Sequence, residues 1–180
     1  MTVTLPRLFV GCSASHGEPL SDIIAEVARV TIPGPYSLHG HPATHAFVVV
    51  GHEDGLWWRL DAAFPKAHWH PWATPQDPTA TALWELRLTQ ENVYRGIHKA
   101  RALDGTPYDM LELAAQLSRA LATRQWVPNA RICTTLVCDV MTACDTVPEG
   151  VVVTLPDRQP ERLCQALHAR EGNWWLHREM

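Results

Sequence analysis

THAFVVVGHEDGLWWRLDA, residues 44–62, is the stretch that decides the fold. Its first half is a valine-rich run, its centre holds Asp54-Gly55, and its second half resumes with apolar residues. β-branched runs favour strands, and Asp-Gly between two such runs favours a tight turn. We therefore expect a hairpin of two antiparallel strands, Ala46–Val50 and Leu56–Ala62.

Further apolar runs extend this hairpin into a sheet with helices. We expect strands over Arg7–Gly11 and Leu83–Leu88, the second half-buried because apolar and polar residues alternate. Helical spacing and capping residues predict helices over Ser21–Val30, Gln90–Leu103, Met110–Thr123, Ile132–Cys144 and Pro160–Arg170. The proline-rich segment Pro65–Pro78 holds Trp69 and Trp72, so we expect a structured loop packed on the body. The pattern indicates an α+β domain.

Composition limits the functional class. The 180 residues suffice for one domain with one core, and 46% of them are apolar. Lys and Arg number 15 against 19 Asp and Glu, and no segment concentrates basic residues, so we expect no nucleic-acid partner. No apolar run approaches the roughly 20 residues of a membrane span. Because no signal-peptide pattern opens the sequence, we expect a cytoplasmic protein, with release by lysis, secretion or a virion left open.

Five cysteines, an odd number without a C-x-x-C pair, imply at least one free thiol. Cys133 lies where a loop enters a predicted helix, and the unpaired N–H groups of a first helical turn favour a thiolate. Cysteine elsewhere is commonly a small buried apolar residue. We therefore expect Cys133 to be reactive and the remaining four to be packing residues: Cys12, Cys138, Cys144 and Cys164.

His45 opens the valine-rich strand, where a rigid element holds its ring within reach of solvent, as a general base requires. His45 and Asp61 lie at equal distances from the centre of the predicted turn, so the hairpin register places them opposite each other. A carboxylate there would fix the imidazole tautomer and stabilise its cation. The alternatives are that His45, one of ten histidines, merely ends a strand and that Asp61 is a surface residue.

The order of these residues resembles the circularly permuted branch of the NlpC-type papain-like cysteine hydrolases, the YaeF/YiiX-like group. In that group a His-bearing strand and an acidic residue precede a Cys-bearing helix. The matching segments are Thr44–Val50, Leu60–Ala62, Ala100–Asp109 and Cys133–Val137, within roughly residues 40–145. Asp61 stands where the pattern has Glu, which puts the third catalytic role in question, and Thr135 replaces a further Glu.

The resemblance implies one papain-like domain over residues 1–180, with a small antiparallel sheet packed against helices and Cys133 at a helix N-terminus. It implies an amidase or peptidase without a cofactor, in which Cys133 attacks the carbonyl, His45 transfers the proton and Asp61 orients His45. Candidate substrates are a small peptide, a peptidoglycan-type cell-wall fragment or an acyl compound. A thioesterase or acyltransferase acting on lipid or protein acyl groups uses the same three residues. The Cys133 N–H and Tyr108 are candidate oxyanion donors, and Trp69 and Trp72 candidate walls of the substrate cleft.

Two other classes of site remain open. Five histidines invite a zinc site that Asp61 or Cys133 would complete: His39, His41, His45, His68 and His70. No H-E-x-x-H pattern supports it. Eight tryptophans indicate a binding module instead, in which exposed Trp69 and Trp72 stack against sugar or aromatic groups.

Overall fold

One antiparallel sheet forms the centre of the molecule, in a computed structural model that describes residues 5–15, 17–32, 34–51, 57–72, 81–110, 113, 132–146, 159–169 and 174–177. Its strands are β1 (Arg7–Ser13), β2 (His45–Gly51), β3 (Trp57–Ala62), β4 (Ala67–Pro71), β5 (Thr81–Leu86) and β6 (Trp174–His177). They lie in the order β4-β3-β2-β1-β5-β6, and each neighbouring pair is antiparallel. The longer helices of the described residues are α1 (Pro19–Thr31), α2 (Gln90–Ala102), α4 (Cys133–Ala143) and α5 (Pro160–His168).

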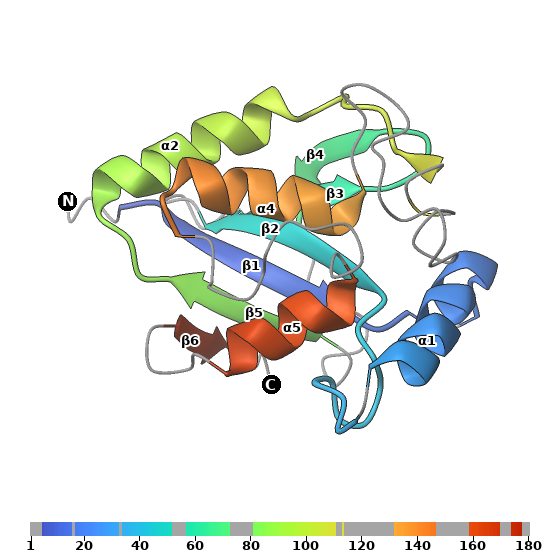
Figure 1. The fold of residues 1–180 in the computed structure, drawn as a ribbon. Helices are drawn as coiled ribbons and strands as arrows, with labels where there is room; N and C mark the ends of the chain where they lie inside the picture. The colour runs from blue at the N-terminus through green and yellow to red at the C-terminus, as the bar shows by residue number, and fades with distance from the viewer. Residues whose placement is uncertain are drawn as a thin grey trace.

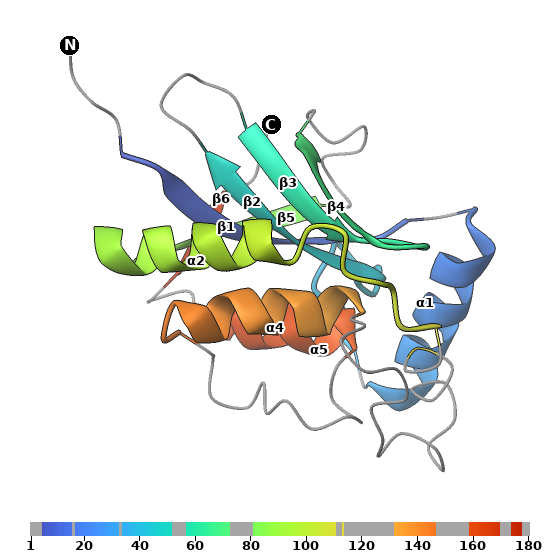
Figure 2. The same ribbon diagram turned by 90° about the horizontal axis from the view of Figure 1, so that it is seen from above.

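The helices α2, α4 and α5 cover one face of the sheet, while α1 lies beyond one end of it (Figures 1 and 2). The main core fills the space between sheet and helices with alternate residues of the central strands, such as Leu8 and Val48, and with Leu136 of α4. The intervening strand residues, including Phe9 and Phe47, form a second apolar cluster on the other face. The α+β class is confirmed as an antiparallel sheet packed against helices.

The predicted hairpin is present, but its register differs from the one expected. Asp61 pairs with Phe47, not with His45. The shift is two residues, and because side chains alternate with a period of two, it leaves His45 and Asp61 on the same face as diagonal neighbours. The connecting residues 52–56, from which the register was counted, lie outside the described residues.

Two strands were not expected. The segment Pro65–Pro78, interpreted as a loop, contains β4, which pairs along β3. Pro71 at the end of this short edge strand and Pro65 shortly before it explain the error, because proline is tolerated at the end of an edge strand. The second unexpected strand is β6, which pairs with β5.

The prediction that β5 is half-buried is wrong, since Leu83 and Trp84, on opposite faces, are both buried. Helix α1 begins at Pro19 with Glu18 as N-cap, earlier than expected. The Thr89 cap of α2 is confirmed, because its side chain accepts a hydrogen bond from the N–H of Asn92.

Most of the predicted helix Met110–Thr123 lies outside the described residues. Within the described part of the chain, no helix combines the length and the apolar character that crossing a membrane requires. The helix that matters most for the site is α4, which packs directly on β2.

Candidate active site

Cys133 and His45 meet where β2 and α4 both begin. Cys133 is the first residue of α4 and His45 the first of β2, and both starts lie at the same end of the sheet (Figures 1 and 2). Their side chains are hydrogen-bonded to each other. The structure thus joins a thiol and an imidazole that lie far apart in the sequence.

Asp61 binds the other side of the same imidazole. His45 Nε2 donates to Asp61 Oδ1 at 2.7 Å. Because this bond occupies Nε2, Nδ1 is the ring nitrogen that faces Cys133. The expected contact between the His45 and Asp61 side chains is therefore present, although the two residues are diagonal neighbours and not directly opposed as predicted.

Two residues that the sequence did not single out for this role hold Asp61 in place. Arg59 contacts Asp61 Oδ1 through Nε at 2.8 Å and through Nη2 at 2.7 Å. His70 Nε2 binds Asp61 Oδ2 at 2.8 Å, and its Nδ1 donates to the carbonyl oxygen of Pro71 at 2.9 Å. These two contacts fix the orientation of the His70 ring against Asp61.

These three residues share a face because of strand alternation. Asp61 and Arg59 are two apart on β3, and His70 pairs with Arg59 from β4. Strand alternation along β4 would have placed His70 on this face. Because the segment was interpreted as a loop, no face was predicted for His70. The guanidinium of Arg59 also lies over the ring of Phe47, with its Cζ 3.6 Å from the ring centroid.

The electrostatics of the site favour a charged pair. Burial opposes the cationic form of His45, but hydrogen bonds and charge from Asp61 and Cys133 outweigh it and raise its pKa to about 9. Burial also opposes ionisation of Asp61, yet His45, Arg59 and His70 together hold its pKa well below its usual range.

At Cys133, burial raises the thiol pKa, but other contacts reverse the effect. The hydrogen bond and charge of His45, with the backbone N–H groups of Ala46 and Thr134, lower the pKa of Cys133 below its ordinary value. The site therefore favours a Cys133 thiolate beside a His45 imidazolium, the state in which a cysteine is nucleophilic.

Thr135 closes the first turn of α4 with hydrogen bonds to Ile132. Its Oγ1 accepts a hydrogen bond from the N–H of Ile132 at 3.0 Å and donates to the carbonyl of Ile132 at 3.0 Å. Ile132 is the N-cap and Thr135 is the third residue of the helix. A hydrogen bond from the N-cap N–H to the side chain of the third residue is one half of a capping box, and that side chain is usually Glu or Gln. Ile132 has no polar side-chain atom with which to cap the first-turn N–H groups beside Cys133.

A cleft of about 520 Å³ opens beside His45 and Asp61. Its lining residues come from the start of α1, from β2–β4 and from the segment after α2, and include Glu18, Ser21, Arg59, Phe64, His68, His70 and Tyr108. Tyr108, a candidate oxyanion donor, therefore lies in the same cleft as the catalytic candidates.

Trp69 and Trp72 are not among the residues that line this cleft. Trp69 points to the opposite face of β4 from His68 and His70, where it packs against the main core and stacks on Trp58. Trp72 packs beside Trp57 with ring centroids 5.7 Å apart, in the second apolar cluster. The structure thus places both candidate walls outside the cleft: Trp69 lies on the opposite sheet face, and Trp72 lies beside Trp57 at the end of β3 away from Asp61.

The other candidates are placed as follows. All five cysteines are free and buried, and Cys12, Cys138, Cys144 and Cys164 belong to the main core as expected. Among the side chains that the structure describes, no three His, Cys, Asp or Glu residues are arranged to hold a metal ion. His39 and His41 lie in a turn before β2, and His68 is exposed, with Nδ1 3.8 Å from Asp104.

Comparison of the chain with protein-family models, with curated proteins and with solved structures gave no match. Any function assigned to the site therefore depends on its own geometry. That geometry provides a nucleophile, a proton carrier and an oriented carboxylate in one hydrogen-bonded row. It is the arrangement that acyl transfer through a covalent intermediate requires.

Proposed function

We propose that the protein is a cysteine hydrolase of the amidase or peptidase type, with Cys133 as nucleophile, His45 as general base and acid, and Asp61 as the residue that orients His45. One observation carries the proposal. Cys133, His45 and Asp61 form a continuous hydrogen-bonded row in which the pKa of the thiol is lowered and that of the imidazole raised to about 9. Structural cysteines in a core lack such a partner.

The reaction follows from these positions. The Cys133 thiolate attacks the carbonyl carbon of an amide, and the carbonyl π electrons move to oxygen. As the tetrahedral intermediate collapses, the C–N bond breaks and His45 gives its Nδ1 proton to the departing nitrogen. Water then enters, neutral His45 takes one of its protons, and attack on the thioester releases the acid and restores the thiolate.

The oxyanion of the intermediate needs donors. The backbone N–H of Cys133 at the start of α4 is the first, since the N–H groups of a first helical turn have no acceptor within the helix. The hydroxyl of Tyr108, which lines the adjoining cleft, is the second. The positive end of the α4 dipole adds to the same stabilisation.

The same arrangement supports a papain-like fold of the circularly permuted NlpC type. The His-bearing strand and the acidic strand precede the Cys-bearing helix in the chain, and the helix packs on the His-bearing strand. We extend the proposal to the substrates that this resemblance implies, namely small peptides, including peptidoglycan-type fragments. Ester or thioester substrates use the same three residues.

Trapping the acyl-enzyme tests the proposal. Incubation with p-nitrophenyl acetate, acid quenching and peptide mapping by mass spectrometry should locate one acetyl group on Cys133. The variant Cys133→Ala should form no adduct, whereas Cys164→Ala, which changes a buried core thiol, should form it normally. Acetylation spread over several cysteines or lysines, or an unchanged adduct in Cys133→Ala, would rule out Cys133 as the nucleophile.

A further inference from the structure

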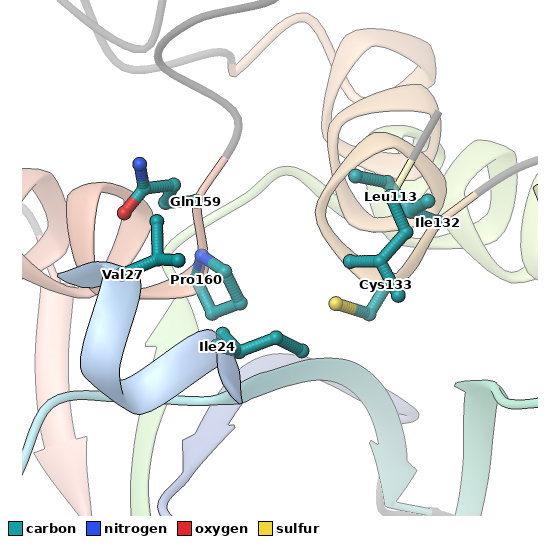
Figure 3. A pocket seen from close by; sticks show the side chains of 7 residues that line it. All are labelled: Ile24, Val27, Leu113, Ile132, Cys133, Gln159 and Pro160. Carbon is teal, nitrogen blue, oxygen red and sulfur yellow. The ribbon is translucent and has the colours of Figure 1, made fainter. Parts of the chain in front are cut away.

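Cys133 lines a small pocket that is distinct from the cleft at His45. Its walls are Ile24 and Val27 of α1, Ile132 and Cys133 at the start of α4, Leu113, and Gln159 and Pro160 at the start of α5. Figure 3 shows the Cys133 sulfur pointing toward Ile24 and Pro160 across the gap. Ile24 borders both spaces, and His45, which lines the cleft, is hydrogen-bonded to Cys133, which lines the pocket, so the two spaces lie on either side of this contact.

The two spaces differ in chemistry. Apart from Cys133, the one polar residue of the pocket is Gln159, whose Nε2 donates to Thr31 Oγ1 at 3.1 Å. Its amide points away from the Cys133 sulfur (Figure 3), so the wall that faces the sulfur is aliphatic. The cleft carries Arg59, His68 and His70 instead. A ligand that spans Cys133 therefore meets an apolar surface on one side and a polar surface on the other.

The direction of the reaction decides which part of the substrate lies on which side. His45 must reach the leaving atom in order to protonate it, so the leaving group lies in the cleft that His45 lines. The acyl carbon is bonded to the sulfur, and its substituent extends away from the leaving group. That side is the pocket into which the sulfur points.

We propose that the substrate joins a short aliphatic acyl group, bound in the pocket of Ile24, Val27 and Pro160, to a polar leaving group bound in the cleft at His45. This inference rests on the proposed function and names its substrate class. The pocket volume of about 10 Å³ is enough for one methyl-sized group, so a short chain such as that of a butanoyl group places only its terminal methyl there.

Two isosteric esters test the acyl side. p-Nitrophenyl butanoate and p-nitrophenyl methoxyacetate differ by one CH₂ replaced with an ether oxygen, and both release p-nitrophenolate. The kcat/KM of each ester is divided by its rate constant for hydrolysis by hydroxide, which corrects for the difference in intrinsic reactivity. We expect this corrected kcat/KM to be about fivefold or more higher for the butanoate. An equal or reversed preference would overturn the proposal.

Two positions on α1, one buried and one exposed, locate the preference. Ile24→Asn should abolish the butanoate preference, whereas Val30→Asn, on the same helix and 77% exposed, should retain it. Ile24→Val, which enlarges the pocket by one methylene, covers the case in which Ile24→Asn fails to fold, and should raise the kcat/KM ratio of pentanoate to butanoate. An unchanged ratio in Ile24→Val would contradict the proposal.

The alkylation rate of Cys133 by iodoacetamide separates the two proposals. Fast alkylation of Cys133 and ester cleavage without an acyl preference would overturn only the substrate class. Absence of both selective alkylation and cleavage would overturn the proposed function itself.

Discussion

Cys133, at the start of α4, and Cys12, near the end of β1, are neighbouring thiols with almost equal burial, 3% and 0% exposed. Burial raises the pKa of both. At Cys12 the contact with Cys164 and the charges of Cys164, Glu161 and Cys133 raise it further, to well above its ordinary value. At Cys133 the imidazole of His45 and two backbone N–H groups reverse the effect.

The comparison shows that burial does not decide which thiol reacts. A third buried thiol, Cys144, has a pKa raised to about 11 by burial and by the charge of Asp145. Only at Cys133 do a cation and hydrogen-bond donors converge on the sulfur, among the cysteines whose pKa the surroundings shift. Thiolate stabilisation by these donors is therefore the property to test.

The largest effect should come from removing the thiol itself. Cys133→Ala should abolish substrate hydrolysis, because no other side chain in the row can form the acyl-enzyme. Cys12→Ala removes a thiol of the same burial and should leave kcat/KM within about twofold, since Cys12 has no role in the proposed chemistry. Steady-state hydrolysis of an activated ester measures both. A loss of activity in Cys12→Ala greater than in Cys133→Ala would reverse the assignment.

Removing the imidazole should make Cys133 resemble Cys12. In His45→Ala the pKa of Cys133 should rise, because burial remains while the cation is gone, and amide hydrolysis should fall by about 10²–10⁴-fold. In the wild type, amide hydrolysis should decline above pH 9 as His45 loses its proton, whereas iodoacetamide alkylation, which needs only the thiolate, should persist. Parallel decline of the two reactions would argue against His45 as the general acid.

Asp61→Asn should have the next largest effect. The amide keeps the size of the side chain but removes the charge that stabilises the His45 cation, and its NH₂ competes for the positions that Arg59 and His70 donate to. We expect the pKa of His45 to fall toward its ordinary value and kcat to drop by about 10²-fold or more. NMR titration of the His45 ring protons measures the pKa, and an unchanged value would exclude Asp61 as its stabilising partner.

His70→Gln should have the smallest effect. Glutamine keeps one donor group but lacks the rigid ring that holds it 2.8 Å from Asp61 Oδ2, so kcat should fall by about two- to tenfold, the worth of one hydrogen bond. His98→Gln, an exposed histidine on α2, is the matched control and should have no effect. A loss as large as that of Asp61→Asn would show that His70 contributes more than the positioning of Asp61.

The sequence predicted the parts of the site that depend on local structure. The helix-start position of Cys133 and the strand-start position of His45 follow from capping and periodicity. Asp61 was predicted as the partner of His45 from the register of the hairpin. The predicted register was wrong by two residues, but a shift of two keeps both side chains on the same face of the sheet.

The support of Asp61 was not predictable, because it depends on a strand that the sequence conceals. β4 is short, ends in proline and lies in a proline-rich segment, so its alternation was not recognised. Without that strand, His70 had no assigned neighbour and Trp69 no assigned face. The pocket beside Cys133 is likewise invisible in the sequence, since α1, α4 and α5 supply its walls from distant segments.

The most direct test of the central claim is the pH dependence of alkylation at each cysteine, measured in the folded protein by iodoacetamide and peptide-resolved mass spectrometry. We predict that Cys133 reacts first and that its rate reaches half of its maximum below pH 8.5, the ordinary thiol value. Cys12, equally buried but without an imidazole, should remain unmodified over the same range. A Cys133 that titrates like an ordinary thiol, or reacts no faster than Cys12, would contradict the account.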